Sequence, residues 1–296
     1  MREILRFKPL EKQAVWGSES WVIAAHPHGD GIISQGSFHG QTLGQLWQSN
    51  PDLFGNLGGE CFPLLIKDIR AESDLSIQVH PDDAYARIHE NGASGKSECW
   101  YILDGCPDAR LILGHNADGR AQAEEWVQEG RWQEFLRTIS VRPGDFIQID
   151  AGCVHAICGG IKLLEIQQNS DITYRLYDYD RLSNGQKRAL HIKRSLDVIT
   201  YGRSPEVIPY QEQPEDGVRR ARLVSTPFYE VERIQLEQAH TFHQSHPFLC
   251  ISVIQGNGML DGTPLSQGDH LLLPCQYGDF QMEGPLTCIF TCVPAG

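Results

Sequence analysis

The sequence predicts an all-β dominated fold, an antiparallel β sandwich or barrel with a few helices. Short apolar or alternating runs recur along the chain with Gly, Pro, Asn and Asp between them, which is the spacing of short antiparallel strands. Segments with the wider apolar spacing of amphipathic helices are fewer. A similar turn-and-strand pattern occurs in each half of the chain, which indicates two related domains.

The strands predicted in the N-terminal two thirds of the chain are short apolar runs bounded by turn-forming residues. They span residues 62–69, 75–80, 99–103, 110–113, 146–149, 162–166 and 172–177. Helices are predicted where apolar side chains recur every three or four positions. They span residues 82–90, 121–128 with 131–137, and 191–199.

A polar stretch follows Thr200 and has little to bury, so we interpret it as a connector. It separates a predicted N-terminal catalytic domain at residues 1–205 from a smaller C-terminal domain at residues 218–296. Short strands are again predicted beyond the connector. They span residues 221–224, 228–234, 248–254, 258–260, 270–274 and 285–292.

Composition excludes several classes of partner. The formal net charge of −13, with no block of Lys and Arg, opposes binding to nucleic acid or to an anionic membrane. No apolar run approaches the roughly 18 residues of a membrane span. The nine cysteines form no Cys-x-x-Cys pair, so we expect reduced thiols and a cytoplasmic protein. Monomer and homodimer both remain open.

Four polar residues are placed where they could share one divalent metal. Strand alternation puts Ser76, Gln78 and His80 on one face of one strand. It puts Lys96, Glu98 and Trp100 on one face of a second strand. With His155, these strands offer imidazole, carboxylate and amide ligands, which suit zinc and leave manganese, cobalt and iron open. Each residue alone has an ordinary structural explanation, and the metal site is favoured by their joint occurrence.

The repeated pattern differs between the two halves at one position. Residues 143–149 and 267–273 each place a Gly-Asp turn before an apolar strand. His155 stands eleven positions after Gly144, whereas Asp279 stands eleven positions after Gly268. The C-terminal domain is therefore predicted to lack a metal site.

Three motifs in order resemble the class I mannose-6-phosphate isomerases in their short bacterial, zinc-dependent form. They are LSIQVHPDD at residues 75–83, HENGASGKSECWY at residues 89–101 and LEIQQNSDITYRLYDYDR at residues 164–181. The resemblance implies a tandem cupin (a double-stranded β-helix, or jelly roll) and one Zn²⁺ per chain. It places His80, Glu98 and His155 at the main ligand positions and Gln78 at an additional one.

The resemblance also assigns residues to catalysis and substrate binding. Arg175 falls on the active-site arginine, Lys96 on a lysine beside the metal, and Ser76 on a substrate-contacting serine. Arg181 is a further candidate for binding the phosphate, or else a solvated arginine past the end of a strand. From the residues alone, Arg175 could instead form a cross-strand ion pair with Glu165.

The implied reaction interconverts mannose 6-phosphate and fructose 6-phosphate through a cis-enediol, with the metal polarising the oxygens at C1 and C2. Arg175 and Lys96 would stabilise oxyanion charge or hold the phosphate, and Lys96 could alternatively act as the base. Two other functions stay open. Two histidines and a carboxylate also describe a non-haem iron oxygenase, and a cupin can bind a sugar phosphate without turnover.

Overall fold

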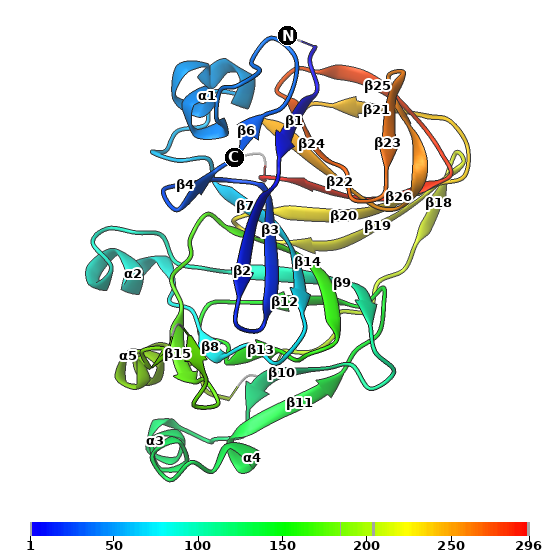
Figure 1. Cartoon of the computed structure of the whole chain (residues 1–296). Helices are drawn as coiled ribbons and strands as arrows, with labels where there is room; N and C mark the ends of the chain where they lie inside the picture. Colours follow the sequence, from blue (N-terminus) through cyan, green and yellow to red (C-terminus); the bar gives the residue numbers. More distant parts are fainter. Residues whose placement is uncertain (1, 184, 203–204, 295–296) are drawn as a thin grey trace. The chain divides into compact units, whose positions relative to one another are not determined.

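Strands dominate the computed structural model, and helices are few, as predicted (Figure 1). The structure describes residues 2–183, 185–202 and 205–294. Its residues cluster into two compact units that are interleaved along the chain. Unit 1 contains Met1–Leu10, Trp21–Leu65 and Pro209–Gly296, and unit 2 contains Glu11–Ser20 and Ile66–Ile208.

These units differ from the contiguous segments predicted from the sequence. Residues 1–10 and 21–65 cluster with the C-terminal part of the chain, although they precede the predicted connector. One physical reason is strand pairing over a long sequence separation, because Leu5 pairs with Leu272. The division into domains at residues 1–205 and 218–296 therefore stays a prediction.

Unit 2 contains a five-stranded antiparallel sheet that carries three of the predicted site residues. Its strand order is β11(Leu136–Ser140), β10(Arg110–His115), β13(His155–Ile157), β8(Ile77–Val79) and β15(Tyr174–Tyr177). The short strand β8 fixes the positions of His155 and Arg175 relative to each other, because its Gln78 is the register partner of His155 on one side and of Arg175 on the other.

A six-stranded sheet provides the second layer. Its strand order is β12(Phe146–Ile149), β9(Glu98–Gly105), β14(Ile161–Gln168), β7(Leu64–Ala71), β3(Gly17–Ile23) and β2(Leu10–Ala14), and the unit boundaries fall within its last three strands. Trp100 and Leu163 from this sheet pack in one buried cluster with Leu111 and Ile157 from the five-stranded sheet. Unit 2 is thus a β sandwich with an apolar core between its sheets.

Helices cover the other face of the five-stranded sheet. They are α2(Asp83–His89), α3(Arg120–Gln128), α4(Trp132–Phe135) and α5(Ile192–Val198). Val127, Phe135 and Leu196 from these helices pack against Val79 and Ala156 of the sheet. The helix predicted at residues 131–137 ends earlier than expected, because residues from 136 onward pair with β10 as strand β11. A two-stranded hairpin of β16(Leu182–Ser183) and β17(Gln186–Lys187) completes this unit.

Unit 1 is also strand-rich and has its own core. Its helical segments are α1(Leu43–Ser49) and the short 3-10 helix η1(Pro51–Phe54). Its strands near the N-terminus are β1(Leu5–Lys8), β4(Ala25–His26), β5(Gly29–Asp30) and β6(Ile32–Ile33). Those towards the C-terminus are β18(Gln213–Glu215), β19(Val218–Ser225), β20(Glu230–Leu236), β21(His240–Gln244), β22(Phe248–Leu260), β23(Thr263–Ser266), β24(His270–Pro274), β25(Gly278–Glu283) and β26(Leu286–Cys292). The main sheet runs β18-β19-β20-β26-β22-β24-β1-β6, with β21, β23 and β25 attached through β22.

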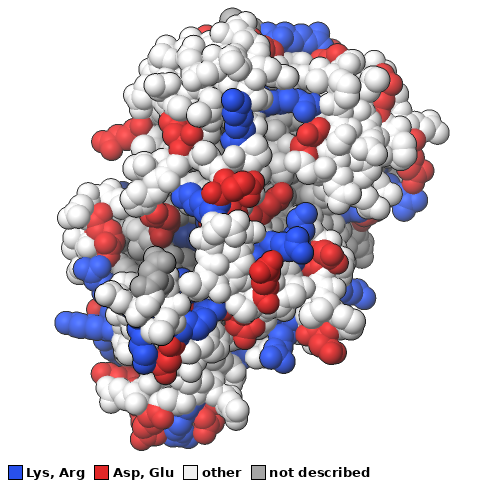
Figure 2. All heavy atoms as spheres, in the orientation of Figure 1, with Lys and Arg blue, Asp and Glu red and all other residues white. Residues whose placement is uncertain are grey.

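Charged side chains of both signs are mixed on the surface. Figure 2 shows Lys and Arg interspersed with Asp and Glu over the face in view. The net charge of −13 is therefore not gathered in one acidic area of that face. Among the described residues, no helix is long and apolar enough to cross a membrane.

Candidate metal centre and active site

Three buried side chains meet between the two sheets of unit 2. His80 follows β8, His155 begins β13, and Glu98 begins β9 in the facing sheet. Their side chains are at most 1% exposed, and one ligand atom from each lies within 4.8 Å of the others. The His155 Nε2 atom is 3.3 Å from Glu98 Oε1, and His80 Nε2 is 3.6 Å from Glu98 Oε2. This spacing leaves the three groups around one common point.

Backbone contacts hold His80 at the end of its strand. Pro81 and Asp82 end the strand, and the Asp82 side chain caps α2 by accepting from the Tyr85 amide at 2.8 Å. The Gly152 amide donates to the His80 carbonyl, and the Lys96 amide donates to the Pro81 carbonyl. The segments that carry His80, Glu98 and His155 are therefore tied together at the backbone.

Both imidazoles are oriented as metal ligands usually are. The Nδ1 atom of His80 lies 2.7 Å from the Ile172 carbonyl oxygen, and that of His155 lies 3.0 Å from the Cys153 carbonyl oxygen. Because a carbonyl can only accept, each Nδ1 carries the proton, and each Nε2 presents a lone pair toward Glu98. Burial lowers the pKa of His155 to about 4 and that of His80 well below its ordinary value, with Lys96 adding to both effects. Both rings are neutral at pH 7.

Gln78 brings a fourth polar group to the same place. Its side-chain Nε2 lies 3.4 Å from the Nε2 of His155, its register partner across β8 and β13. The structure therefore brings together all four of the predicted ligand residues, His80, Glu98, His155 and Gln78.

A row of alternating buried charges extends from Glu98 into the sheet. The Lys96 Nζ atom is 2.7 Å from Glu98 Oε2 and 3.8 Å from Glu165 Oε1. Lys67 Nζ lies 2.8 Å from the same Glu165 oxygen, and Trp100 Nε1 donates to Glu165 Oε2 at 3.1 Å. The charged side chains of this row are at most 6% exposed, so their mutual pairing is what makes their burial tolerable.

The two carboxylates of this row have different proton affinities. Burial and the nearby Glu165 carboxylate raise the pKa of Glu98, although Lys96 opposes the shift. Burial alone would raise the pKa of Glu165 as well, but Lys67 and Lys96 outweigh it and lower that pKa. Glu98 is thus a carboxylate whose charged form gains from a further cation beside it.

These buried charge pairs contradict one interpretation of Arg175 made from the sequence. They also include a residue, Lys67, that the sequence analysis did not place in the site. Glu165 pairs with Lys67 and Lys96, so its suggested cross-strand pairing with Arg175 is wrong. Lys67 was not predicted as part of the site. The available signal was a lysine within the otherwise apolar first half of β7, where an unpaired charge is costly.

The remaining predicted residues lie in different surroundings. Arg175 on β15 is half-buried, and its Nε atom has no hydrogen-bond partner among the described residues. Burial and the nearby Arg188 lower its pKa. Ser76 is buried just before β8. Arg181 instead donates to Asp178 at 2.7 Å and to the Asp74 carbonyl, so internal acceptors use its guanidinium.

The described strands and the buried cluster together define a cupin protein with a candidate metal centre. Two family models match the chain. The type I phosphomannose isomerase catalytic domain matches residues 6–99, and the mannose-6-phosphate isomerase cupin domain matches residues 220–293.

Individual relatives extend this likeness over nearly the whole chain. Mannose-6-phosphate isomerase ManA of Bacillus subtilis is 43% identical, with 97% of this chain and 98% of the relative covered. The mannose-6-phosphate isomerase of Streptococcus mutans is 41% identical, with 92% of this chain and 87% of the relative covered. The crystal structure of the Bacillus subtilis mannose 6-phosphate isomerase superposes with a TM-score of 0.95 at 36% identity, covering 98% of this chain and 99% of the other.

The chain belongs to the type I mannose-6-phosphate isomerase family. This confirms the resemblance, the tandem cupin fold class and the enzyme class predicted from the sequence. A putative mannosephosphate isomerase from Archaeoglobus fulgidus, at 18% identity and a TM-score of 0.77, shares the fold.

Proposed function

We propose that this protein interconverts mannose 6-phosphate and fructose 6-phosphate with one Zn²⁺ held by His80, Glu98, His155 and Gln78. The observation that carries the proposal is the convergence of three buried ligand atoms within 4.8 Å in a chain of this family. The residues also fit a cation. His80 Nε2 and Glu98 Oε1 are buried atoms without a hydrogen-bond partner among the described residues, and a metal would satisfy both.

The protein's own residues would position the sugar and stabilise its charge. A bound Zn²⁺ supplies Lewis acidity to the substrate oxygens at C1 and C2. Lys96, held between Glu98 and Glu165, offers N–H donors to an oxygen that gains negative charge. Arg175 offers a guanidinium whose Nε is not already used, and Ser76 a hydroxyl on the same strand face as His80.

Isomerisation needs one proton to leave C2 and one to reach C1, with O1 gaining a proton and O2 losing one in the direction from aldose to ketose. We propose a cis-enediol between these steps. The base must reach C2 from one face of the open-chain sugar, and Lys96 as an ammonium serves better as a donor than as that base. Arg181 would contribute to phosphate binding only if it released Asp178.

We also propose a cytoplasmic enzyme whose metal centre belongs to the N-terminal catalytic domain at residues 1–205, with a C-terminal cupin-like domain at 218–296 that has no metal. All nine cysteines are in the thiol form, which supports a reducing compartment. The matches of the catalytic-domain and cupin-domain models to separate parts of the chain support the division. The proposed partner is a small sugar phosphate, with monomer and homodimer both compatible.

The test is a coupled assay for fructose 6-phosphate formed from mannose 6-phosphate, on protein of measured metal content. We expect activity that a chelator removes and zinc restores. Full metal occupancy without turnover would contradict the isomerase proposal. Oxygen uptake that depends on iron would then favour an oxygenase, and binding of mannose 6-phosphate without conversion would favour a non-catalytic sugar-phosphate-binding cupin.

A further inference from the structure

On the core-covering face of the C-terminal sheet in unit 1, charged side chains occupy the end that is open to solvent; Arg220, Arg222 and Glu232 are 37%, 65% and 22% exposed. Strands β19, β20 and β26 are paired in register, so their inner faces form rows across the sheet. The row of Val218, Leu236 and Leu286 is apolar and part of the core. Moving two residues along each strand gives the next row on the same face, which consists of Arg220, Ile234 and Cys288. Moving two residues further gives a row of Arg222, Glu232 and Phe290. The inner face thus changes from apolar to charged along its length.

This change breaks the usual rule for a sheet that covers a core. Positions on such a face are normally apolar, and charged residues are expected there only where the face opens to solvent or serves a ligand. The departure occurs on two neighbouring strands and includes both signs of charge. Sites where a local rule is broken in a repeated way are candidates for function.

These residues surround a pocket of about 200 Å³. We call it the Phe–Arg pocket and define it by Arg220, Arg222, Glu232, Phe242, Phe280 and Phe290. The ring of Phe242 lies 5.4 Å from that of Phe280 and 5.4 Å from that of Phe290, so the three rings form one apolar wall. The pocket is smaller than the ~300–1,000 Å³ of sites for drug-sized ligands, and it suits a molecule of about one sugar ring.

The arginines and glutamates that line the pocket are equal in number. Glu232 lies 3.1 Å from Arg220 and 3.7 Å from Arg222. Arg220 is also 3.4 Å from Glu215, and Glu230 lines the same pocket. Two guanidinium groups therefore face two carboxylates in the lining, and His243 and His246 line the pocket as well, so the pocket has no uncompensated group of cations to hold a phosphate. The side chains still offer both donors and acceptors around an apolar wall.

We propose that the Phe–Arg pocket binds a small neutral polyhydroxylated ligand, a single unphosphorylated sugar. The C–H groups of a sugar can contact the small exposed parts of Phe242 and Phe290, which are 6% and 7% exposed, and its hydroxyls can both accept from arginine and donate to glutamate. Every residue that defines the pocket belongs to unit 1, whereas the His80–Glu98–His155 cluster belongs to unit 2. The site is therefore additional to the proposed catalytic site.

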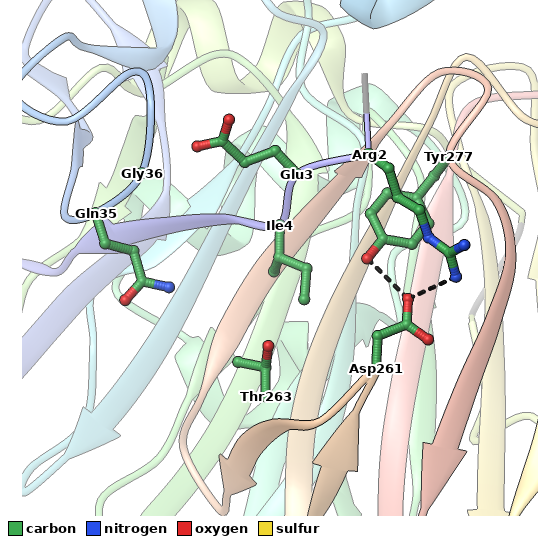
Figure 3. Close-up of a pocket in the computed structure, with 8 residues that line it drawn as sticks. All are labelled: Arg2, Glu3, Ile4, Gln35, Gly36, Asp261, Thr263 and Tyr277. Carbon is green, nitrogen blue, oxygen red and sulfur yellow. Dashed lines mark hydrogen bonds and ion pairs between the residues drawn. The ribbon is translucent and has the colours of Figure 1, made fainter.

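A larger hollow in unit 1 has fewer groups left for a ligand. It measures about 600 Å³ and lies beside Arg2, Ile4, Asp261 and Tyr277 (Figure 3). Figure 3 shows the Arg2 guanidinium and the Tyr277 hydroxyl both directed at the Asp261 carboxylate, at 2.9 Å and 3.0 Å. These three polar groups are thus occupied with one another.

The experiment is isothermal titration calorimetry on the full chain, with D-mannose as the neutral probe and inorganic phosphate as the anionic probe. Arg222→Gln removes a pocket charge from a side chain that is 65% exposed, so the fold should survive. The matched control is Arg219→Gln, because Arg219 is its 56% exposed neighbour on β19 with the opposite orientation. Glu230→Gln is a second pocket variant of unchanged size.

We expect saturable binding of D-mannose to the wild-type protein and weaker binding of phosphate. Arg222→Gln should weaken mannose binding by about tenfold or more, the loss expected for a charge-assisted hydrogen bond, and Glu230→Gln should also weaken it. Arg219→Gln should change the affinity for mannose by less than about twofold. All three variants should keep isomerase activity. The proposal is overturned if mannose does not bind, if Arg222→Gln weakens phosphate binding more than mannose binding, or if Arg222→Gln and Glu230→Gln both bind mannose as the wild type does.

Discussion

At the scale of single residues, the candidate centre depends on where protons and charges sit. Two backbone carbonyls fix the protonated nitrogen of His80 and His155, and this leaves two lone pairs facing one carboxylate. The Lys96 ammonium already lies 2.7 Å from that carboxylate. Lys96 is therefore close enough to act on any group bound at the cluster, and it is held there by Glu165 as well as by Glu98.

Replacing Lys96 with Met tests its proposed role as a donor. The variant keeps the unbranched chain up to the ε position but removes the charged amino group, so we expect turnover to fall about 10²–10³-fold, as when an oxyanion donor is removed. Zinc content should stay at one per chain, because Lys96 is not among the proposed ligands. Steady-state kinetics and metal analysis measure the two effects, with the exposed Lys162→Met as the control. Unchanged turnover would rule out Lys96 as donor and as base.

The residue types of the centre could be read from the sequence, but their supporting charges could not. Strand alternation placed Gln78 and His80 on one face, and the structure brings both to His155 and Glu98. Lys67 and Glu165 are distant in sequence and meet only because β7 and β14 are neighbours in the six-stranded sheet. A pairing of this kind needs the strand order, which periodicity alone does not give.

At the scale of elements, short strands and tight backbone contacts position the site. Strand β8 has only three residues, yet it joins β13 to β15. Helix α2 then supports the segment before β9, because Asp83 Oδ1 accepts from the Gly95 amide at 2.7 Å. Gly95 also packs so closely that an added Cβ would lie 2.4 Å from the backbone carbon of Asp82. The approach of α2 to this segment thus requires a glycine.

Gly95→Ala should therefore disturb the neighbouring Lys96 and Glu98. The new methyl group meets backbone atoms of Asp82 and Asp83, which cannot move aside as a side chain could. We expect zinc affinity to fall about 10–100-fold, the range for lost outer support of a metal ligand. Competition with a chromogenic chelator measures this affinity. The control is Gly58→Ala, since nothing lies within 4 Å of a Cβ there; equal affinities of the two variants would contradict the prediction.

The sequence predicted some elements well and missed others for identifiable reasons. Helix α1 was not predicted, although Thr42 and Gln45 form a capping box that marks its start. The strands predicted at residues 248–254 and 258–260 form one continuous strand, β22, in which Gly256 and Gly258 are accommodated beside β26. Residues 255–257, which were left out of the predicted strands, include Gly256, and close approach to a neighbouring strand selects glycine there.

At the scale of the whole molecule, strand pairing over long sequence distances decides which residues form a unit. The fold class follows from local periodicity, and it was predicted. The grouping of residues 1–10 and 21–65 with residues 209–296 could not be predicted in the same way. It depends on partners such as Leu5 and Leu272, which no local pattern connects.

The stability of the whole chain should depend on pH through the two buried histidines. The pKa of His155 is about 4 in the folded protein, against about 6.5 when unfolded, and that of His80 is lowered in the same direction. At a pH between about 4 and 6.5, the unfolded chain therefore binds more protons than the folded protein does. The stability that the neutral rings provide is fully present above pH 6.5 and is lost as the pH falls toward 4.

We expect chelator-treated protein to lose about 3 kcal/mol of unfolding free energy through His155 between pH 7 and pH 4, since each unit of pKa difference corresponds to ~1.4 kcal/mol. Urea titrations of the wild type and of His155→Gln measure this, because the variant lacks the titrating ring and should show a shallower pH dependence. His39→Gln is the control, as His39 is exposed and should leave the slope unchanged. Equal slopes for His155→Gln and the wild type would contradict the burial of His155 as a neutral ring.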